Sequence, residues 1–277
     1  MSQYAHPEVL VDTQWLMEHL HDSNLRILEV DMSPEAYDNA HIPGAVFMTI
    51  AELMRPDLSL NLDPVAFSAL LGKSGIDANT TVVAYGNYPG TGAFIFWLFR
   101  LFGHQNIVVL NGGYQQWIAQ GGAVVSELST FPATEYRVQG PDANLRVLSA
   151  EVLAALERPD QILLDVRTEA EYAGELYLME PPQGDEVGGH IPGAVHLDHA
   201  ETLNEDGTFK SADVLLSLFQ QRGITPDKEI FPYCAIGGRS AYVWFVLTYL
   251  LGYPQVRNYD GSWQEWSRLP EVPIERG

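Results

Sequence analysis

The chain contains very little cysteine: Cys234 is the only one among its 277 residues. No disulfide can form within the chain, which excludes the disulfide-stapled scaffolds of small secreted proteins and fits a reducing, cytoplasmic environment. Long apolar runs are also lacking. The two most apolar segments, 93–99 and 241–251, are shorter than the roughly 20 residues that span a bilayer, so we expect no membrane helix. The first residues show no secretory signal.

Basic side chains are scarce as well. The chain has 15 Lys and Arg against 36 Asp and Glu, a net charge of −21 at pH 7. The excess is spread over both halves, with 5 basic and 14 acidic residues in 1–140 (5 − 14 = −9) and 10 and 22 in 141–277 (10 − 22 = −12). Nucleic-acid binding is not expected, because it needs clustered Lys and Arg. Any anion site must be a local positive pocket. High solubility or a salty habitat would explain the acidity equally well.

The residues around Cys234 indicate an anion-handling nucleophile. Residues 229–233 predict a buried strand and residues 240–251 an apolar helix, and Cys-Ala-Ile-Gly-Gly-Arg (234–239) lies between them. A thiol there meets free N–H groups and the positive end of a helix dipole, which favour the reactive thiolate. Gly237 and Gly238 let successive N–H groups curl into an anion-binding nest, and Arg239 adds a permanent charge. The alternative is an inert, buried packing cysteine.

The chain also contains an internal repeat. Two segments recur at a shift of 149 residues, and a third, upstream, recurs at a shift of 136. The pairs are His-Ile-Pro-Gly-Ala-Val at 41–46 and 190–195, Gly-x-x-x-x-Trp at 112–117 and 261–266, and 28–31 with 164–167. The second copy therefore carries an insertion of 13 residues, and its composition between residues 175 and 188 predicts a loop.

Each copy alternates strand and helix patterns. The predicted strands are 26–30, 45–48, 81–85 and 107–110 in the first copy and 161–166, 194–197, 229–233 and 255–258 in the second. The predicted helices are 12–21, 64–71, 91–101, 211–221 and 240–251. This order predicts an α/β fold of two domains, each a parallel β-sheet flanked by helices on both faces. Ligands of such sheets bind beyond the carboxyl ends of the strands, where Cys234 falls.

We expect a first domain at 1–125, a linker at 126–144 and a second domain at 145–277. At the position equivalent to Cys234 the first copy has Tyr85 or Gly86, depending on a one-residue gap. Neither is a nucleophile of this kind. The first domain is therefore expected to be non-catalytic and the second catalytic.

These residues together resemble the tandem-domain rhodanese family of sulfurtransferases. The resemblance rests on the paired His-Ile-Pro-Gly-Ala segments, the Asp-Gly-Ser-Trp-x-x-Trp segment at 260–266 and the Cys-x4-Arg loop. It implies that Cys234 takes sulfane sulfur from a small anionic donor, becomes a persulfide, and passes the sulfur to cyanide or a thiol, with thioredoxin among the candidate acceptors. Two half-reactions through a covalent enzyme form give ping-pong kinetics. The N–H groups of Ala235, Ile236, Gly237 and Gly238 would bind the sulfur.

By the same resemblance, Arg167 takes the family's position for binding the substrate anion. The alternative for Arg167 is a surface salt bridge with Glu169 or Glu171. Asp31 and His41 match residues linked to catalysis in mercaptopyruvate-using members. For His41, as for His190, we expect instead a structural bond from the imidazole to a backbone carbonyl.

The donor and the reaction class each have alternatives. Arg239 completes the Cys-x-x-Gly-x-Arg variant common in bacterial thiosulfate-using members, which favours thiosulfate. Ala235 and Ile236 are neither the basic residues of that type nor the small polar residues of the mercaptopyruvate type, so 3-mercaptopyruvate stays the alternative donor. A Cys-dependent phosphatase would have five residues between Cys and Arg instead of four, and a non-catalytic binding module would lack the cysteine. No motif indicates a metal or another cofactor.

Overall fold

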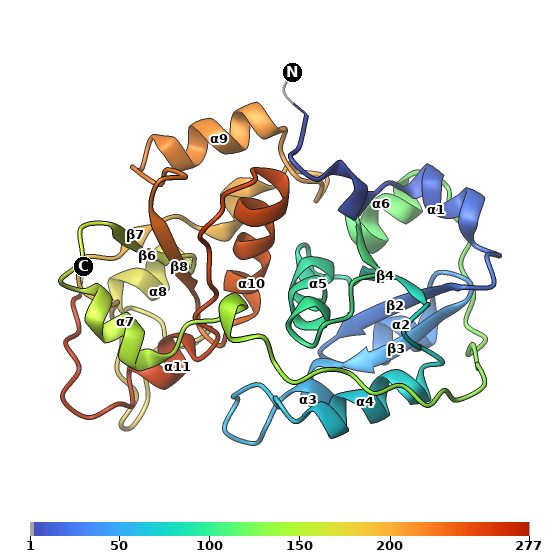
Figure 1. Ribbon diagram of the computed structural model, residues 1–277, viewed down its shortest axis with the longest axis horizontal. Helices are drawn as coiled ribbons and strands as arrows, with labels where there is room; N and C mark the ends of the chain where they lie inside the picture. Colours follow the sequence, from blue (N-terminus) through green and yellow to red (C-terminus); the bar gives the residue numbers. More distant parts are fainter. Residues whose placement is uncertain (1–2, 277) are drawn as a thin grey trace.

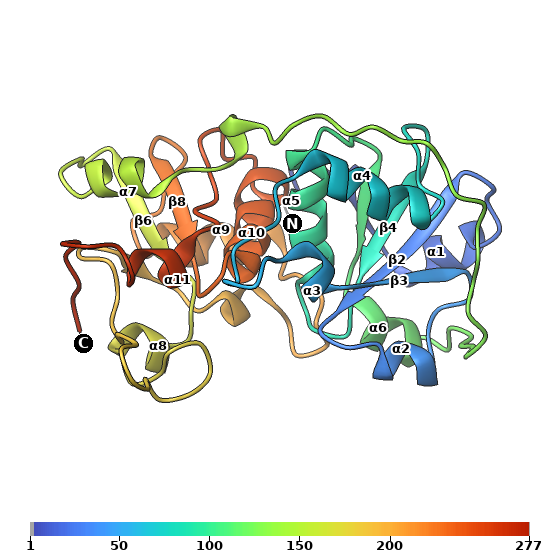
Figure 2. The same ribbon diagram turned by 90° about the horizontal axis from the view of Figure 1, so that it is seen from below.

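The computed structural model describes residues 3–276. Two α/β domains lie side by side, and one helix from each, α5 (Thr91–Leu101) and α10 (Gly238–Phe245), packs between them (Figures 1 and 2). The predicted fold class is confirmed. In both domains the sheet is parallel, and helices lie on both of its faces.

The first domain has five parallel strands in the order β1-β5-β4-β2-β3. The strands are β1 (Leu10–Val11), β2 (Leu25–Asp31), β3 (Ala45–Thr49), β4 (Thr81–Tyr85) and β5 (Ile107–Leu110). Besides α5, its helices are η1 (Pro7–Val9), α1 (Thr13–His19), α2 (Glu35–Asn39), α3 (Ile50–Leu53), α4 (Pro64–Lys73) and α6 (Gly113–Ala119). Successive side chains of a strand point to opposite faces. Ile27 packs with the core under α1, α2 and α6, and Leu28 with the core under α3, α4 and α5.

The second domain repeats this order with three regular strands, β7-β6-β8. Its elements are η2 (Ala143–Leu145), α7 (Ser149–Ala155), β6 (Gln161–Asp165), α8 (Glu169–Ala173), β7 (Val195–His196), η3 (His199–Thr202), α9 (Ala212–Gln220), β8 (Glu229–Tyr233), η4 (Val246–Leu250) and α11 (Ser262–Trp266). Two isolated parallel bridges, Val256 to Ile230 and Asn258 to Arg146, stand where the first domain has β5 and β1.

The predicted strand at 255–258 is therefore wrong as a regular strand. Ile230 donates its N–H to the carbonyl of Gln255, and Arg257 donates to the carbonyl of Ile230. The next donor along β8 would be residue 232, which is a proline and has no N–H. Tyr259 still donates its N–H to the carbonyl of Pro232 at 3.0 Å, but the reciprocal bond from Pro232 is missing, so no second paired position forms.

The predicted helix at 240–251 changes its winding part-way. It begins at Gly238 as α10, and from Val246 to Leu250 it is a π-helix, η4. A π-helix takes more residues per turn than an α-helix. The π segment lies within the stretch Gly237–Gly252, which spans two residues more than the equivalent stretch Gly90–Gly103 of the first domain (252 − 237 = 15 against 103 − 90 = 13).

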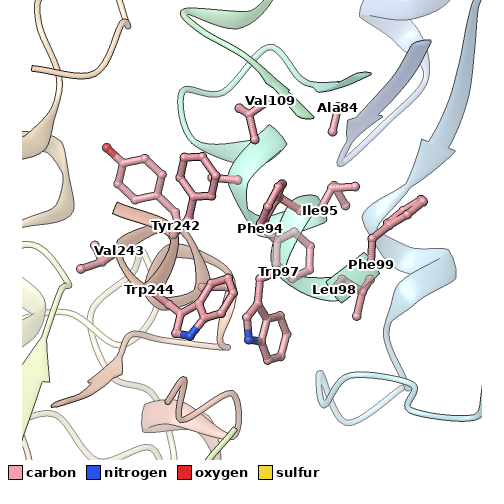
Figure 3. Close-up of a cluster of buried hydrophobic side chains, with 14 of the residues drawn as sticks. Ala84, Phe94, Ile95, Trp97, Leu98, Phe99, Val109, Tyr242, Val243 and Trp244 are labelled. Carbon is pink, nitrogen blue, oxygen red and sulfur yellow. The ribbon is translucent and has the colours of Figure 1, made fainter. Parts of the chain in front are cut away.

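One continuous apolar core joins the two domains. Trp97 of α5 faces α10 (Figure 3). The rings of Phe96 and Phe245 lie 4.9 Å apart, and the Trp97 indole N–H donates to the carbonyl of Leu145, 3.2 Å away. Residues 126–142 carry no regular element and run across the first domain (Figure 2). Among the described residues, no helix has the length and apolar character needed to cross a bilayer.

Candidate active site

Cys234 lies where β8 ends and α10 begins, at the carboxyl edge of the second sheet. Its side chain is almost fully buried, with 1% of the residue surface exposed. The N–H of Gly237 donates to Sγ at 3.2 Å, and the hydroxyl oxygens of Ser240 and Ser262 lie 3.6 Å and 4.0 Å from Sγ. The thiol therefore sits in a small pocket of hydrogen-bond donors within an otherwise apolar core.

The two glycines of the loop are not equivalent. Gly237 has φ +92°, and a Cβ there would lie 2.5 Å from the carbonyl oxygen of Asp260. Only glycine combines that backbone conformation with so close an approach. Gly238 has no positive φ, and a Cβ there would have no atom within 4 Å. The turn that aims an N–H at Sγ thus depends on Gly237.

Several backbone N–H groups of the cysteine loop donate no hydrogen bond within the described chain. Those of Ala235, Ile236, Gly238 and Arg239 donate no hydrogen bond within residues 3–276. Gly237, the N-cap residue of α10, has no capping side chain. Free N–H groups at a helix start carry partial positive charge and bind anions. Of the five N–H groups of the predicted nest, one donates to Sγ and four donate no hydrogen bond within residues 3–276.

Helix α11 holds the cysteine loop through three hydrogen bonds. The N–H of Cys234 donates to Ser262 Oγ at 3.0 Å. Trp263 and Gln264 donate their N–H groups to the carbonyls of Cys234 and Ala235, at 3.0 Å and 2.9 Å. Ser262 adopts φ +54°, which is unusual for a residue other than glycine. The Asp-Gly-Ser-Trp segment therefore fixes the backbone that presents the thiol.

Arg239 is bound to a carboxylate that the sequence did not single out as its partner. Its two terminal nitrogens donate to the two oxygens of Glu171, both at 2.7 Å. Burial lowers the pKa of Arg239, but the hydrogen bonds with Glu171 and the charge of the Cys234 thiolate outweigh it and raise the pKa. The guanidinium thus keeps its charge at the rim of the loop. The sequence signal for Glu171 was the Thr-x-x-Glu capping box at 168–171, which begins α8.

Arg167 has neither of the surface partners considered from the sequence. The salt bridge with Glu169 or Glu171 is wrong, because the guanidinium is fully buried and bonds to both oxygens of Asp165 and to the carbonyl of Gly189. A buried charge needs such pairing. Its Nη1 is buried and has no hydrogen-bond partner among the described residues.

Both histidines of the repeated turns bond to backbone, as expected. His41 Nδ1 lies 2.7 Å from the carbonyl of Tyr37, and His190 Nδ1 lies 2.9 Å from the carbonyl of Tyr172. Each imidazole also stacks on the ring of that tyrosine, with centroids 3.8 Å and 3.7 Å apart. Asp31 is the last residue of β2, and it accepts from the side-chain amide of Asn87 at 3.0 Å.

The strand register identifies the residue that replaces Cys234 in the first domain. Glu29 pairs with Tyr85 as Asp165 pairs with Tyr233, so Gly86 is the equivalent of Cys234. A Cβ on Gly86 would lie 2.5 Å from the carbonyl oxygen of Val30. The first domain has no room for a nucleophilic side chain at this position.

Comparison with known proteins agrees with this geometry. The model of the rhodanese-like domain matches the chain twice, over residues 12–120 and 148–269. The chain belongs to the tandem rhodanese sulfurtransferases. Sulfur carrier protein TtuD of Thermus thermophilus is 43% identical to this tandem rhodanese over 281 residues, with 99% of each chain covered. A protein of Haloferax volcanii named "Putative thiosulfate sulfurtransferase" is 40% identical over 286 residues, covering 100% of this chain and 99% of its own.

Solved structures similar to this tandem rhodanese include the anaerobic ergothioneine biosynthesis enzyme of Chlorobium limicola, bound to trimethyl histidine. That chain is 28% identical, with a TM-score of 0.88, and the match covers 100% of this chain and 72% of that one. A structure of EanB with ergothioneine, at the same identity and TM-score, carries a persulfide on a cysteine of EanB.

Proposed function

We propose that the protein transfers sulfane sulfur from thiosulfate to cyanide or a thiol through a persulfide on Cys234. The observation that carries this proposal is the hydrogen bond from the Gly237 N–H to Sγ, in a loop where the N–H groups of residues 235, 236, 238 and 239 donate no hydrogen bond within residues 3–276. Such donors stabilise a thiolate and then the outer sulfur of a persulfide. Preorganised donors of this kind contribute about 3–4 kcal/mol each at the upper end.

The reaction proceeds in two displacements. The Cys234 thiolate attacks the outer sulfur of thiosulfate, the S–S bond of the donor breaks, and sulfite leaves with the bonding electron pair. Cyanide or a thiolate then attacks the outer sulfur of the persulfide. The second S–S bond breaks, thiocyanate or a new persulfide leaves, and the Cys234 thiolate is restored.

The loop backbone carries most of the donor's charge in this proposal. Arg239 is held by Glu171 and Arg167 by Asp165, so each guanidinium is already paired with a carboxylate. Arg239 keeps its charge beside the thiol, and Arg167 contributes only Nη1. The N–H groups of Ala235, Ile236, Gly237 and Gly238 therefore hold the anionic sulfur. The first domain, residues 1–125, supplies no nucleophile, and residues 126–144 link it to the catalytic domain.

The names of the relatives support both partners. Thiosulfate is named in the relative from Haloferax volcanii, and the Thermus thermophilus relative is named a sulfur carrier. A carrier hands sulfur to another molecule, which supports a thiol acceptor, including a protein such as thioredoxin. The single cysteine suits a reducing cytoplasm.

Intact-mass measurement tests the proposal. After incubation with thiosulfate the protein should gain one sulfur, about 32 Da, on its cysteine. Cyanide should remove that mass, and Cys234→Ser should never acquire it. Incubation with 3-mercaptopyruvate in parallel decides between the two donors. A protein that gains no sulfur from either donor is not a sulfurtransferase of this kind.

A further inference from the structure

Asn258 is a fully buried polar residue beside the cysteine loop. Its side-chain nitrogen donates to the carbonyl of Gly237 at 3.3 Å. Its side-chain oxygen has no hydrogen-bond partner among residues 3–276. Burying an amide that is only partly hydrogen-bonded costs free energy. Within the described chain, the one hydrogen bond that this side chain makes goes to the loop that carries Cys234.

The first domain shows that the fold does not need a polar side chain at this position. The counterpart of Asn258 in the 149-residue repeat is Val109 (258 − 149 = 109). Val109 is buried in β5, between β1 and β4, and lies beside α5 (Figure 3). Its Cγ1 would lie 3.1 Å from a Cβ on Gly92, in the first turn of that helix. An apolar side chain therefore fills this place in the domain that has no nucleophile.

The carbonyl that Asn258 contacts belongs to the N-cap residue of α10. Gly237 and its counterpart Gly90, the N-cap residue of α5, share a φ of +92° and have ψ values of −14° and −13°. The Gly90 carbonyl accepts from two N–H groups of α5. The Gly237 carbonyl accepts from the N–H of Ala241 at 3.1 Å and also from the hydroxyl of Ser240 at 3.0 Å. With Asn258, two side chains therefore hold this carbonyl in the catalytic domain.

Holding the carbonyl also sets the direction of an N–H group. The peptide bond between Gly237 and Gly238 is trans and planar, so its C=O and N–H point in opposite directions. Since the C=O points into α10, the N–H of Gly238 points out of the start of the helix. On that side the N–H of Gly237 and the hydroxyl of Ser240 approach Sγ. Unpaired N–H groups at a helix start bind anions.

We propose that Asn258 is a positioning residue, whose amide holds the Gly237 carbonyl so that the N–H of Gly238 meets the anionic group that reacts at Cys234. The proposal rests on the anion-binding loop of the proposed function and adds to it a residue from outside that loop. Without Asn258 the Gly237 carbonyl keeps two donors, so an apolar replacement leaves no buried group unpaired. Loss of Asn258 should therefore impair the loop without destabilising the fold.

Alkylation of Cys234 by an anionic and a neutral reagent tests the proposal. With iodoacetate or iodoacetamide the thiolate forms an S–C bond, and iodide leaves with the bonding electron pair. Only the anionic reagent gains from the N–H of Gly238. Asn258→Val should lower the ratio of the iodoacetate rate to the iodoacetamide rate about tenfold, because a misdirected donor loses part of the roughly 100-fold that a full donor contributes. Intact mass follows both reactions, and urea unfolding of Asn258→Val should show no loss of unfolding free energy.

Tyr253→Phe is the matched control. It also removes a buried side-chain donor to a backbone carbonyl, that of Ile224, 3.1 Å away and before β8. It should keep the wild-type ratio. Asn258→Ala removes the amide without adding bulk, and it should lower the ratio as Asn258→Val does. Both rates are measured on one preparation, so a change in the folded fraction alters them together.

An unchanged ratio in the Asn258 variants, or an equal fall in Tyr253→Phe, would overturn the positioning role. Alkylation requires the thiol and its loop but no sulfur transfer. A protein that forms no persulfide would therefore refute the proposed function, while the ratio of alkylation rates would still decide the role of Asn258.

Discussion

The neighbouring glycines of the cysteine loop offer a matched pair of substitutions at the residue scale. Gly237→Ala forces a Cβ to within 2.5 Å of the Asp260 carbonyl oxygen at a φ of +92°. The N–H that points at Sγ must then move, and losing one such donor costs about 100-fold in turnover. Gly238→Ala places its Cβ in open space. We expect steady-state rates with thiosulfate and cyanide to fall at least tenfold more for Gly237→Ala than for Gly238→Ala. Similar rates for the two variants would contradict the role of the turn.

The ion pair between Arg239 and Glu171 supports a second prediction. Only 2% of the Glu171 side chain is exposed, so Arg239→Ala leaves a buried carboxylate without its partner. Removing one member of a buried pair costs about 3–5 kcal/mol of unfolding free energy. Glu171→Gln should recover part of that loss in the Arg239→Ala background. Urea unfolding measures both effects.

The sign of the pH dependence follows from Glu171. Burial raises its pKa, but the hydrogen bonds and charge of Arg239 and the bonds from Thr168 outweigh burial, so the pKa lies below its ordinary value of 4.5. The stability from this pair is therefore present above pH 4.5 and is lost as the pH falls through the lowered pKa. The loss of unfolding free energy in Arg239→Ala, relative to the wild type, should shrink as the pH is lowered. A deficit that does not depend on pH would show that lost packing, and not charge, is the cause.

At the scale of elements, the carboxyl end of β2 holds a second buried acid. Glu29 is 1% exposed, accepts from the hydroxyl of Tyr85, and accepts from the side-chain amide of Asn87 at 3.1 Å. Burial and the charge of Asp31 raise its pKa, against the hydrogen bonds of Tyr85 and Asn87, to about 7. The first domain has a proton-binding carboxyl where the second has Asp165 paired with Arg167.

This raised pKa makes stability depend on pH in the opposite direction. Between 4.5 and about 7 the folded protein holds a proton on Glu29 that the unfolded chain has lost. Stability therefore falls as the pH rises through that window and levels off above it. The free energy of unfolding of Glu29→Gln, relative to that of the wild type, should rise by about 2–3 kcal/mol between about pH 5 and about pH 8. For Glu35→Gln, at an exposed residue, this difference from the wild type should not change with pH. Equal curves of unfolding free energy against pH for Glu29→Gln and the wild type would contradict the prediction.

Elements with strong local patterns could be predicted from the sequence. The bounds of β4, β5, β8 and α5 agree with the prediction because their apolar runs are bounded by turn residues. Short helices such as α2 and α8, of five residues each, lack enough periods to be recognised. The predicted strand at 255–258 failed because its neighbour carries Pro232, which no local propensity of 255–258 reveals.

The candidate site was predictable in part for the same reason. Cys234 and its glycines form a local motif and are recognisable from sequence. The partners of the two arginines lie 2 and 68 positions away, and spacing alone did not identify Asp165 or Glu171. Contacts across the domains, such as Gln264 with Asp57, span 207 positions. They depend on how the two sheets pack, which the sequence pattern does not contain.

At the scale of the whole molecule, each domain contacts the other through an equivalent loop. The side-chain amide of Gln264 donates to the carbonyl of Asp57, and that of Gln116 donates to the carbonyl of Asp206, at 3.1 Å and 3.3 Å. Asp57 and Asp206 are related by the 149-residue repeat (206 − 57 = 149). Each domain therefore contributes a loop that contacts the other, in addition to the shared core of α5 and α10 (Figure 3).

These reciprocal contacts and the shared core predict a single unfolding transition. Trp97 is fully buried between the domains, and Trp97→Ala should lower the free energy of unfolding by about 3–5 kcal/mol. Fluorescence and far-UV circular dichroism should still report one coincident transition. Val65→Ala, at a residue that is 73% exposed, is the control and should change little. Two separate transitions would mean that the domains fold independently.

The presence of one thiol has a consequence for the fate of the sulfur. In many redox proteins a second cysteine in the same chain attacks the modified one and releases it. This chain has no second cysteine, so a persulfide formed on Cys234 as proposed would have no internal route back to the thiolate. Its lifetime would then be set by the supply of acceptor in the surroundings. The protein would act as a one-atom reservoir of sulfur, emptied only by an encounter with another molecule.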